Sequence, residues 1–298
     1  MSYASAVSLR TALESRLNAA GSSGPVSVSR LRKMVAMERF LARLLATAPN
    51  QWLLKGGVAL EFRFPNLARA TKDLDLWMRE SEASATEALI AATEVDLNDF
   101  FVFAVERTGV HEFGIDDGGA AVRYRLRADM AGREFETVVI DVGFGVAVDE
   151  TPDVLTRPSL LAFADFEPIR VPALSLDHHV AEKLHAYTRR YGGEATSSRV
   201  KDLVDLTLIA ASETFQADRL RHAIERTFDA RASHPLPGSL PAPPSNWERP
   251  YARLADGVAI EDDYLAGHWL VAKFLNPILE GISDGNFRWN PKLAEWSN

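Results

Sequence analysis

The spacing of hydrophobic positions predicts a small sheet placed between two groups of helices. Apolar residues that recur every three or four positions predict amphipathic helices. In the first half of the chain such helices are predicted over residues 7–20, 29–45 and 58–64. We expect Ser29 to be the N-cap of the second helix. Short or alternating apolar runs predict strands, over residues 52–54, 73–77, 100–107, 121–127 and 134–142. Gly132 lies between the last two strands, as a hairpin turn requires.

From residue 176 onward the pattern becomes helical. The predicted elements are helices over residues 176–191, 199–211 and 217–230, a proline-rich extended connector over residues 234–250, and a last helix over residues 262–281. Together the patterns predict an α/β (α+β) fold. Its first domain, residues 1–175, combines N-terminal helices with a small mixed sheet, and its second, residues 176–298, is helical.

The composition is that of a globular protein and excludes several kinds of site. The chain has 298 residues, 47% hydrophobic and 25% charged, which suffices for one large or two modest domains. No apolar run approaches the roughly 20 residues that span a bilayer, and the N-terminus lacks the pattern of a secretory signal. The absence of cysteine excludes disulfides, thiolate metal sites and cysteine nucleophiles. We therefore expect a cytoplasmic protein without a membrane partner.

The charge balance is acidic. Against 41 Asp and Glu the chain has 33 Lys and Arg, a net charge of −8, whereas proteins that bind long nucleic acids are usually basic. Arginines and lysines do gather locally, so they either form a small RNA-binding patch or belong to solvated faces with interspersed acids. These residues are Arg123, Arg125 and Arg127 on one predicted strand, and Arg189, Arg190, Arg199 and Lys201 further on.

Two aspartates alternate with leucines in one predicted strand. Asp73 and Asp75 are two positions apart, so their side chains point to the same face. Adjacent carboxylates repel each other unless a cation lies between them. Mg²⁺ prefers such oxygen ligands, and nucleotidyl transfer commonly uses two of these ions. The pair therefore indicates a metal site, although on its own it is also compatible with a solvated sheet edge.

Two further features flank this pair. Gly56 and Gly57 lie between a strand and a helix, where they either let the backbone approach a phosphate or form a tight turn. Lys55 beside them is either a phosphate ligand or a surface lysine. Asp141 interrupts an apolar strand, where an unpaired charge is costly. It therefore predicts either a metal shared with the aspartate pair or a structural ion pair with an arginine.

A second cluster of charges lies in the helical half. Lys183 is on one predicted helix, and the next helix is apolar almost all round except for Asp202 and Asp205, which share a face. Buried aspartates need cationic partners, for which Lys183 and Arg199 are the candidates. The cluster is either a set of core ion pairs or a site in which Lys183 grips a nucleoside triphosphate while Asp205 positions the lysine or the sugar.

The order of these motifs resembles a known superfamily. Gly-Gly, then two aspartates alternating with apolar residues, then a later strand with one acid is the order of the DNA-polymerase-β-like nucleotidyltransferases. The longer pattern KGG…RATKDLDL, followed by EKLHA…RVKDLVDL, resembles the AbiEii/AbiGii nucleotidyltransferase toxins of type IV toxin–antitoxin systems, and most closely their MenT-type branch. The resemblance extends to the N-terminal helices and to FDARASHPLP, and thus covers most of the chain.

This resemblance implies a role for each candidate residue. The metal-binding acids are Asp73 and Asp75, with Asp141 as the third; the nucleotide-binding residues are Lys55, Gly56, Gly57, Arg69 and Arg199; and the essential residues of the second motif are Lys183 and Asp205. Thr71 matches a Ser/Thr position that the antitoxin phosphorylates in some toxins of the MenT branch.

The activity implied is Mg²⁺-dependent transfer of a nucleoside monophosphate from an NTP to the 3′ end of tRNA, which blocks translation. We expect two Mg²⁺ ions, with Asp141 on the ion nearer the attacking hydroxyl, and an antitoxin encoded by a neighbouring gene. The acidic charge favours contact restricted to the acceptor end. The alternatives are a nucleotidyltransferase acting on a protein or small molecule, or a non-catalytic nucleotide-binding partner protein. A catalytically dead copy tends to lose its acids or glycines, and this chain has all of them.

Overall fold

The computed structural model describes residues 3–24, 26–112, 120–144, 151–189, 199–282 and 284–298. Packing separates them into two compact units. The first contains the described residues up to Asn66 and those from Ala70 to Leu174, and the second contains Leu67–Arg69 and those from Ser175 onward. The predicted domains, residues 1–175 and 176–298, remain a prediction.

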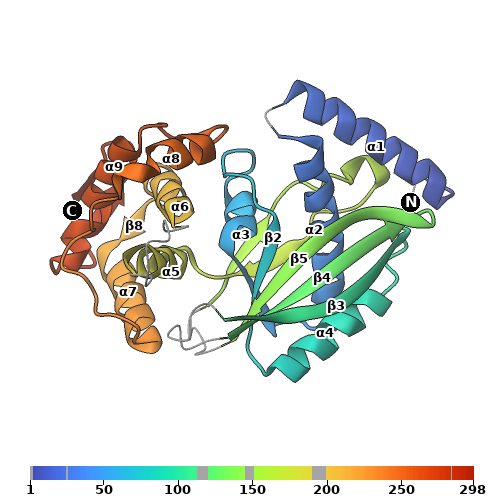
Figure 1. Ribbon diagram of the computed structural model, residues 1–298, viewed down its shortest axis with the longest axis horizontal. Coiled ribbons are helices and arrows are strands. Elements are labelled where there is room, and N and C mark those ends of the chain that lie inside the picture. The colour runs from blue at the N-terminus through green and yellow to red at the C-terminus, as the bar shows by residue number, and fades with distance from the viewer. Residues whose placement is uncertain (1–2, 25, 113–119, 145–150, 190–198, 283) are drawn as a thin grey trace. The chain divides into compact units, whose positions relative to one another are not determined.

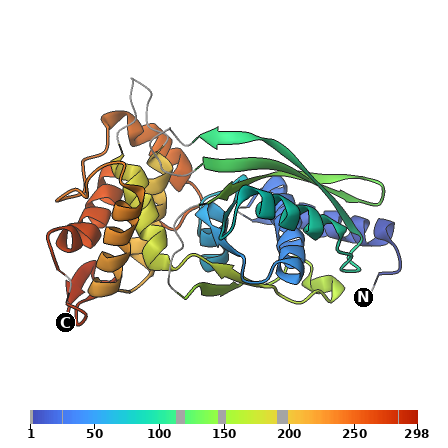
Figure 2. The same ribbon diagram turned by 90° about the horizontal axis from the view of Figure 1, so that it is seen from below.

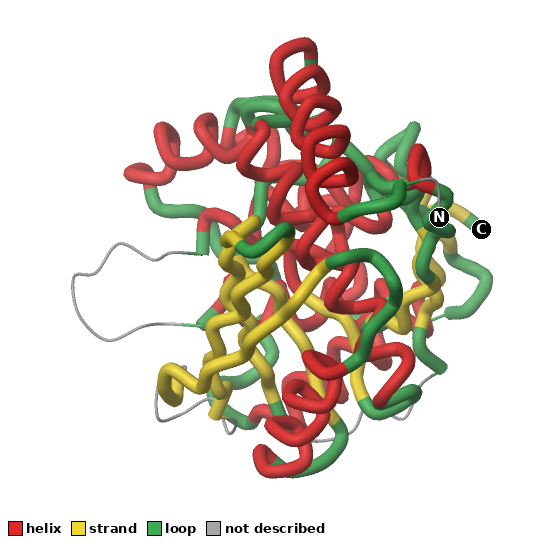
Figure 3. Tube along the Cα trace, turned by 90° about the vertical axis from the view of Figure 1, so that its right-hand side faces the viewer, coloured by secondary structure: helices red, strands yellow, loops and turns green. Residues whose placement is uncertain are grey.

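A seven-stranded mixed sheet is the centre of the first unit (Figure 1). Its order is β3-β4-β5-β2-β1-β7-β6. Strand β2 runs parallel to β5 and β1 parallel to β7, while the remaining neighbours are antiparallel. The twist of the strands is visible in Figure 3, where they are yellow. The strands are β1 (Trp52–Lys55), β2 (Asp73–Met78), β3 (Phe101–Glu112), β4 (Ala120–Met130), β5 (Arg133–Gly143), β6 (Asp153–Thr156) and β7 (Arg170–Ala173). The α/β prediction is thereby confirmed.

Helices cover one face of strands β3, β4 and β5. Helices α2 (Val28–Thr47) and α4 (Glu82–Glu94) lie against this face in Figure 2, and α1 (Ala6–Ser23) packs on α2. The strands alternate accordingly: Leu74 and Leu76 of β2 are fully buried, whereas Asp73, Asp75 and Trp77, which alternate with them, are partly exposed. The period-2 pattern thus separates the core face from a face that carries charged side chains.

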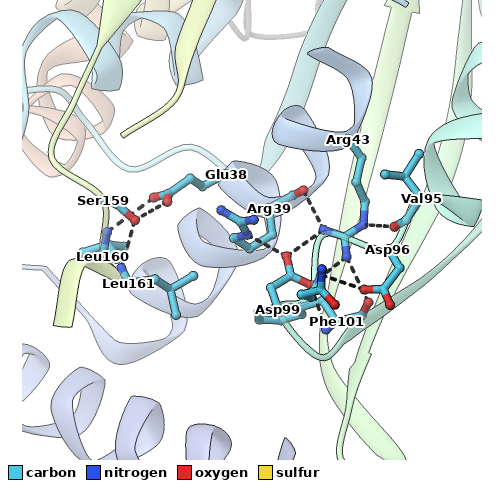
Figure 4. Close-up of polar contacts among 11 residues, drawn as sticks. Glu38, Arg39, Arg43, Val95, Asp96, Asp99, Phe101, Ser159, Leu160 and Leu161 are labelled. Carbon is cyan, nitrogen blue, oxygen red and sulfur yellow. Dashed lines mark hydrogen bonds and ion pairs between the residues drawn. The ribbon is translucent and has the colours of Figure 1, made fainter. Parts of the chain in front are cut away.

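Buried charges anchor α2 to the segment before β3 (Figure 4). Arg39 and Arg43 both point at Asp99, with nitrogen–oxygen distances of 2.7 Å, and all three side chains are almost completely buried. Burial by itself would raise the pKa of Asp99, but the hydrogen bond and charge of Arg43 and the charge of Arg39 lower it below its usual range. On the same helix Glu38 accepts a hydrogen bond from Ser159. These contacts tie α2 to its neighbours through buried polar groups that are hydrogen-bonded, as buried polar groups in folded proteins generally are.

Several element boundaries differ from the prediction. The N-cap of α2 is Ser27, whose side chain accepts from the Arg30 backbone N–H, and Ser29 lies inside the helix. Helix α3 (Gly56–Arg63) begins at the glycines rather than after them. Helix α4 was not predicted, because its buried positions are mostly alanines, such as Ala85 and Ala92, which show little hydrophobic contrast. The short strands β6 and β7 were also not predicted, and the 3-10 helix η1 (Ala162–Ala164) lies between them.

The second unit is mostly helical, as the pattern predicted. Helix α6 (Val200–Ser212) is buried on nearly all sides and packs against α5 (Leu176–Thr188), α8 (Glu248–Ala255) and α9 (Tyr264–Leu279), while α7 (Ala217–Arg231) packs on α5. The connector predicted over residues 234–250 ends earlier, at the 3-10 helix η2 (Ser245–Trp247). A small antiparallel sheet was not predicted; it consists of β8 (Phe215–Gln216), β9 (Arg288–Asn290) and β10 (Glu295–Ser297). In the described part of the chain, none of the helices has both the length and the hydrophobicity of a membrane span.

Candidate active site

Four charged residues of the first unit lie opposite one another across four neighbouring strands. Arg123 of β4 is paired in register with Asp141 of β5. Asp141 is in turn paired with Asp75 of β2, and Asp75 with Lys55 of β1. Directly opposed residues place their side chains on the same face of a sheet. The result is a charged row, Arg123–Asp141–Asp75–Lys55, in which two acids stand between two cations.

Asp73 adds a third carboxylate beside this row. It precedes Asp75 by two positions on β2, on the same face, and both are partly exposed. Its register partner on β5 is Val139, so the residue opposite Asp73 brings no charge. Two neighbouring carboxylates that solvent can reach are the kind of oxygen donors that a divalent ion prefers. Asp73 and Asp75 therefore fit a metal ion of the Mg²⁺ type.

Asp141 is held by an arginine. The Nε and Nη2 atoms of Arg123 each donate to one of its carboxylate oxygens at 2.7 Å, and Asp141 is only 6% exposed. The hydrogen bond from Arg123 to Asp141 raises the pKa of Arg123, and the charges of Asp141, Asp73 and Asp75 add to this shift. Of the two interpretations of Asp141, the ion pair is the one formed here, while metal ligation stays a prediction. Among the described residues no group of three His, Cys, Asp or Glu side chains has a metal-binding arrangement.

In the sequence Arg123 stood out only as a member of a basic cluster, which was either an RNA-binding patch or a solvated face. The hairpin alone does not indicate its pairing. The turn pairs Met130 with Arg133, and only a register shift at Ala128/Asp129 brings Arg123 opposite Asp141. The other two arginines of this strand also have acidic partners. Arg125 lies 3.8 Å from Glu106, and Arg127 lies 3.1 Å from Asp129, which is typical of a solvated, charge-balanced face.

The two glycines lie directly against the site residues. Gly56 has φ +66°, and a Cβ there would overlap the carboxylate of Asp75. At Gly57 a Cβ would come within 2.8 Å of the hydroxyl oxygen of Thr71. Both glycines are thus required for close approach by neighbouring side chains, a reason that the sequence alone does not reveal.

Replacing Gly56 with alanine is expected to destabilise the protein more than the same change at Gly132. Gly132 has φ +73°, but a Cβ added there would have no atom within 4 Å, so its alanine variant carries only the backbone cost of about 1–2 kcal/mol. An alanine at position 56 also overlaps Asp75, and we expect this overlap to lower the free energy of unfolding by at least about 1 kcal/mol more. Urea unfolding of both variants measures the difference. Equal losses would show that Asp75 moves aside freely.

The N-terminus of α3 carries a partial positive charge that favours an anion. Its N-cap residue, Lys55, makes no side-chain capping bond, and the first turn contains no acid. Backbone N–H groups at such a terminus favour a negatively charged ligand. The Lys55 ammonium reaches toward β5, where it lies 3.3 Å from the position of a Cβ built on Gly143. Lys55 and the start of α3 therefore bring positive charge close to the acids of the row.

A second charged cluster lies wholly in the second unit. The Nζ atom of Lys183, on α5, is 2.6 Å from Asp205 and 3.5 Å from Asp202, both on α6. Arg69 donates two further hydrogen bonds of 2.9 Å to the two oxygens of Asp205. Arg199, at the N-cap of α6, lies 3.6 Å from Asp202. Asp205 is thus shared between a lysine and an arginine.

Pairing outweighs burial in setting the pKa values of Asp205 and Lys183 and favours the charged form of both. Burial by itself would raise the pKa of Asp205, but the charges and hydrogen bonds of Lys183 and Arg69 outweigh it and bring the pKa to about 2. For Lys183, burial by itself would lower the pKa, but the charges of Asp205 and Asp202 raise it. The arrangement agrees with core ion pairs between two helices, and a role of Lys183 in binding a triphosphate stays a prediction.

The candidate residues therefore form two groups, one in each unit. The first unit brings together Lys55, Gly56, Gly57, Thr71, Asp73, Asp75 and Asp141, and the second brings together Arg69, Lys183, Arg199 and Asp205. Thr71 is partly buried, and its hydroxyl donates a weak bond of 3.4 Å to the backbone oxygen of Asp73. Arg190, one of the basic residues considered for RNA, lies outside the described residues.

Comparison with known proteins gives one family match. A family model described as "Nucleotidyl transferase AbiEii toxin, Type IV TA system" matches residues 39–275. MenT4, a nucleotidyltransferase toxin from Mycobacterium tuberculosis H37Rv, is 22% identical; the similarity covers 66% of each chain with a TM-score of 0.42. JHP933 from Helicobacter pylori is 14% identical over 86% of this chain and 95% of that chain, with a TM-score of 0.46. No curated protein matches the sequence.

Proposed function

Because the chain belongs to the AbiEii family of nucleotidyl transferase toxins of type IV toxin–antitoxin systems, we propose that it transfers a nucleoside monophosphate from an NTP to the 3′ end of tRNA in the cytoplasm. The resemblance expected from the motifs is thereby confirmed, and the family implies an antitoxin as partner. Loss of a free tRNA 3′ end stops aminoacylation and so translation. The observation that carries the proposal is the charged row with Asp73 beside it, next to the glycine-rich start of α3.

Asp73 and Asp75 are the residues that we assign to Mg²⁺. Their carboxylates are partly exposed on one strand face and have hard oxygen donors, which suits this ion. When bound there, the ion supplies charge neutralisation for the α-phosphate and a lower pKa for the attacking ribose hydroxyl. Asp75 is held against Gly56, so the chain positions one of the two ligands before any substrate binds.

Positive groups of the chain are assigned to the triphosphate. Lys55 and the N–H groups that open α3 bind and orient the phosphates, because a helix N-terminus and a lysine both favour an anion. By family resemblance Lys183, Arg69 and Arg199 also belong to nucleotide binding. Asp205 is a positioning residue in this assignment, since it fixes both Lys183 and Arg69. The positive groups in this assignment also stabilise the negative charge that develops when pyrophosphate leaves.

Labelled NTPs offered separately to total tRNA and to total cellular protein test the proposal. We expect Mg²⁺-dependent label at tRNA 3′ ends with one or more of the four NTPs, and none when Asp73 is replaced by asparagine. Label in the protein fraction alone would establish a protein acceptor instead. Tight binding of Mg-NTP without label in either fraction would establish a non-catalytic nucleotide-binding protein.

Phosphorylation of Thr71 is expected to switch the enzyme off. The Thr71 hydroxyl lies against Gly57 at the start of α3, so a phosphate there would occupy the place assigned to the triphosphate and add about −1.5 to −2 charges. We expect NTP affinity to fall by at least about tenfold, since one lost charge-assisted contact is worth about 1.4 kcal/mol or more. Intact mass after co-expression with the neighbouring gene reports the modification, and titration with NTP reports its effect.

Thr71→Ala provides the control for this switch. It cannot be phosphorylated, and it should keep its transfer activity in the presence of the antitoxin. A phosphate on Thr71 that leaves NTP affinity unchanged would refute the switch. A wild-type protein neutralised by its antitoxin without any added mass would leave Thr71 with a structural role only.

A further inference from the structure

Both carboxylate oxygens of Asp141 are already bound. Arg123 donates to each of them at 2.7 Å, in the bidentate geometry that makes arginine–carboxylate pairs strong. Asp141 is 6% exposed, so little water competes for its oxygens. A metal ion that approaches this carboxylate meets the guanidinium charge at the same two oxygens, and like charges repel, so the two cations compete for Asp141.

The surroundings distinguish this pair from an ordinary structural ion pair. Asp141 lies directly opposite Asp75, so the row places two acids between Arg123 and Lys55, and Asp73 stands beside the row, two positions before Asp75 on β2. The side chain of Arg123 is 31% exposed and can leave, unlike that of a buried structural arginine such as Arg43, which is 0% exposed.

Arg125 shows what an ordinary pair on this face looks like. It lies two positions further along the same strand and on the same face as Arg123. Its side chain is 61% exposed, and its acidic partner, Glu106, is 3.8 Å away and is itself exposed. Arg123 thus differs from its neighbour in having a close, bidentate and nearly buried partner that belongs to the acid cluster.

We propose that Arg123 is a positioning residue that competes with a second divalent ion for Asp141. Without nucleotide, the enzyme then binds one ion, on Asp73 and Asp75, while Arg123 holds Asp141 in place. This inference rests on the metal site of the proposed function. Arg123 thus supplies a cation to the acidic cluster. Asp141 stays paired until Arg123 leaves it, and it then becomes available to the second ion.

Mn²⁺ titration of the full chain without nucleotide tests the proposal, with free Mn²⁺ followed by its EPR signal. We expect one bound ion in the wild type and two in Arg123→Gln, in which the affinity for the second ion rises at least about tenfold, the effect of one close charge. In the double variant Arg123→Gln/Asp141→Asn the count should return to one. Arg125→Gln is the matched control and should bind one ion, as the wild type does.

A second measurement is thermal unfolding with and without Mn²⁺. Saturating Mn²⁺ should raise the Tm of Arg123→Gln by more than that of the wild type, because the ion then replaces the missing guanidinium beside Asp141. If Arg123→Gln does not fold, Arg123→Lys retains the charge without the bidentate pair and should also bind the second ion more tightly than the wild type.

The outcomes separate the inference from the function on which it rests. Two ions bound to the nucleotide-free wild type, or one ion in Arg123→Gln with unchanged affinity, overturns the inference alone, provided that Asp73→Asn abolishes the first ion. A wild type that binds no Mn²⁺, or keeps its ion in Asp73→Asn, overturns the proposed metal site and the inference together.

Discussion

Replacing Asp73 with asparagine is expected to abolish nucleotidyl transfer while leaving the free energy of unfolding unchanged or slightly higher. Asp73 and Asp75 point to the same face of β2, and the residue opposite Asp73 on β5 is Val139, which brings no positive charge to it. Removing one charge therefore relieves like-charge repulsion in the metal-free protein. Transfer should fall by at least about 100-fold, the scale of several kcal/mol that a catalytic metal contributes.

The comparison that isolates this effect is Asp129→Asn. Asp129 pairs with Arg127 in the same β4–β5 hairpin but lies outside the charged row, so its loss should leave the transfer rate near that of the wild type. The rate of label incorporation and the urea midpoint are measured for both variants. More than a few per cent of wild-type transfer in Asp73→Asn would remove Asp73 from the mechanism.

Replacing Asp205 with alanine is expected to be the most destabilising change in the second cluster. Lys183 and Arg69 both lose their close partner, and neither is well exposed, with side chains 8% and 12% accessible. Breaking a buried pair in this way costs about 3–5 kcal/mol. Lys183→Ala should cost less, because Asp205 keeps both hydrogen bonds from Arg69 and Asp202 keeps Arg199 nearby.

The pH dependence of this contribution has a definite sign. The pKa of Asp205 in the folded protein, about 2, lies below its usual value of 3.8. A carboxyl whose pKa is depressed by folding stabilises the protein above its unfolded pKa, and the stabilisation is lost as the pH falls through the folded pKa. The difference between wild type and Asp205→Ala should therefore be constant near neutrality and shrink only below about pH 4.

Transfer rates in the same variants show whether the two residues act as a unit. If Asp205 serves transfer by positioning Lys183, the double variant should be little slower than the slower single variant, because both changes remove the same interaction. A double-mutant cycle with single-turnover rates measures this coupling. Strictly additive losses of transfer rate would show that Lys183 and Asp205 act independently. Equal losses in the free energy of unfolding for the two single variants would contradict the role of Arg69.

The sequence alone was sufficient for those features that depend on local patterns. Alternation of acid and leucine predicted that β2 has one buried and one polar face, and Gly132 predicted the hairpin between β4 and β5. The order of the glycine pair, the aspartate pair and the second motif indicated the family that the chain matches over residues 39–275. Helix α4 was missed because alanine provides little hydrophobic contrast. Strands β6 to β10, of two to four residues each, were missed because so few positions show no period.

Only the tertiary structure decided how the charges are paired. Asp141 was compatible with a metal or an arginine, and the neighbouring strand supplies Arg123. Arg69, which the family resemblance assigns to nucleotide binding, forms two hydrogen bonds with Asp205, 136 positions away in the chain. Gly56 makes room for Asp75 rather than only shaping a turn. Local periodicity determines which face a side chain is on, but the partner of a buried charge depends on which strand or helix packs next to it, and on the register between them.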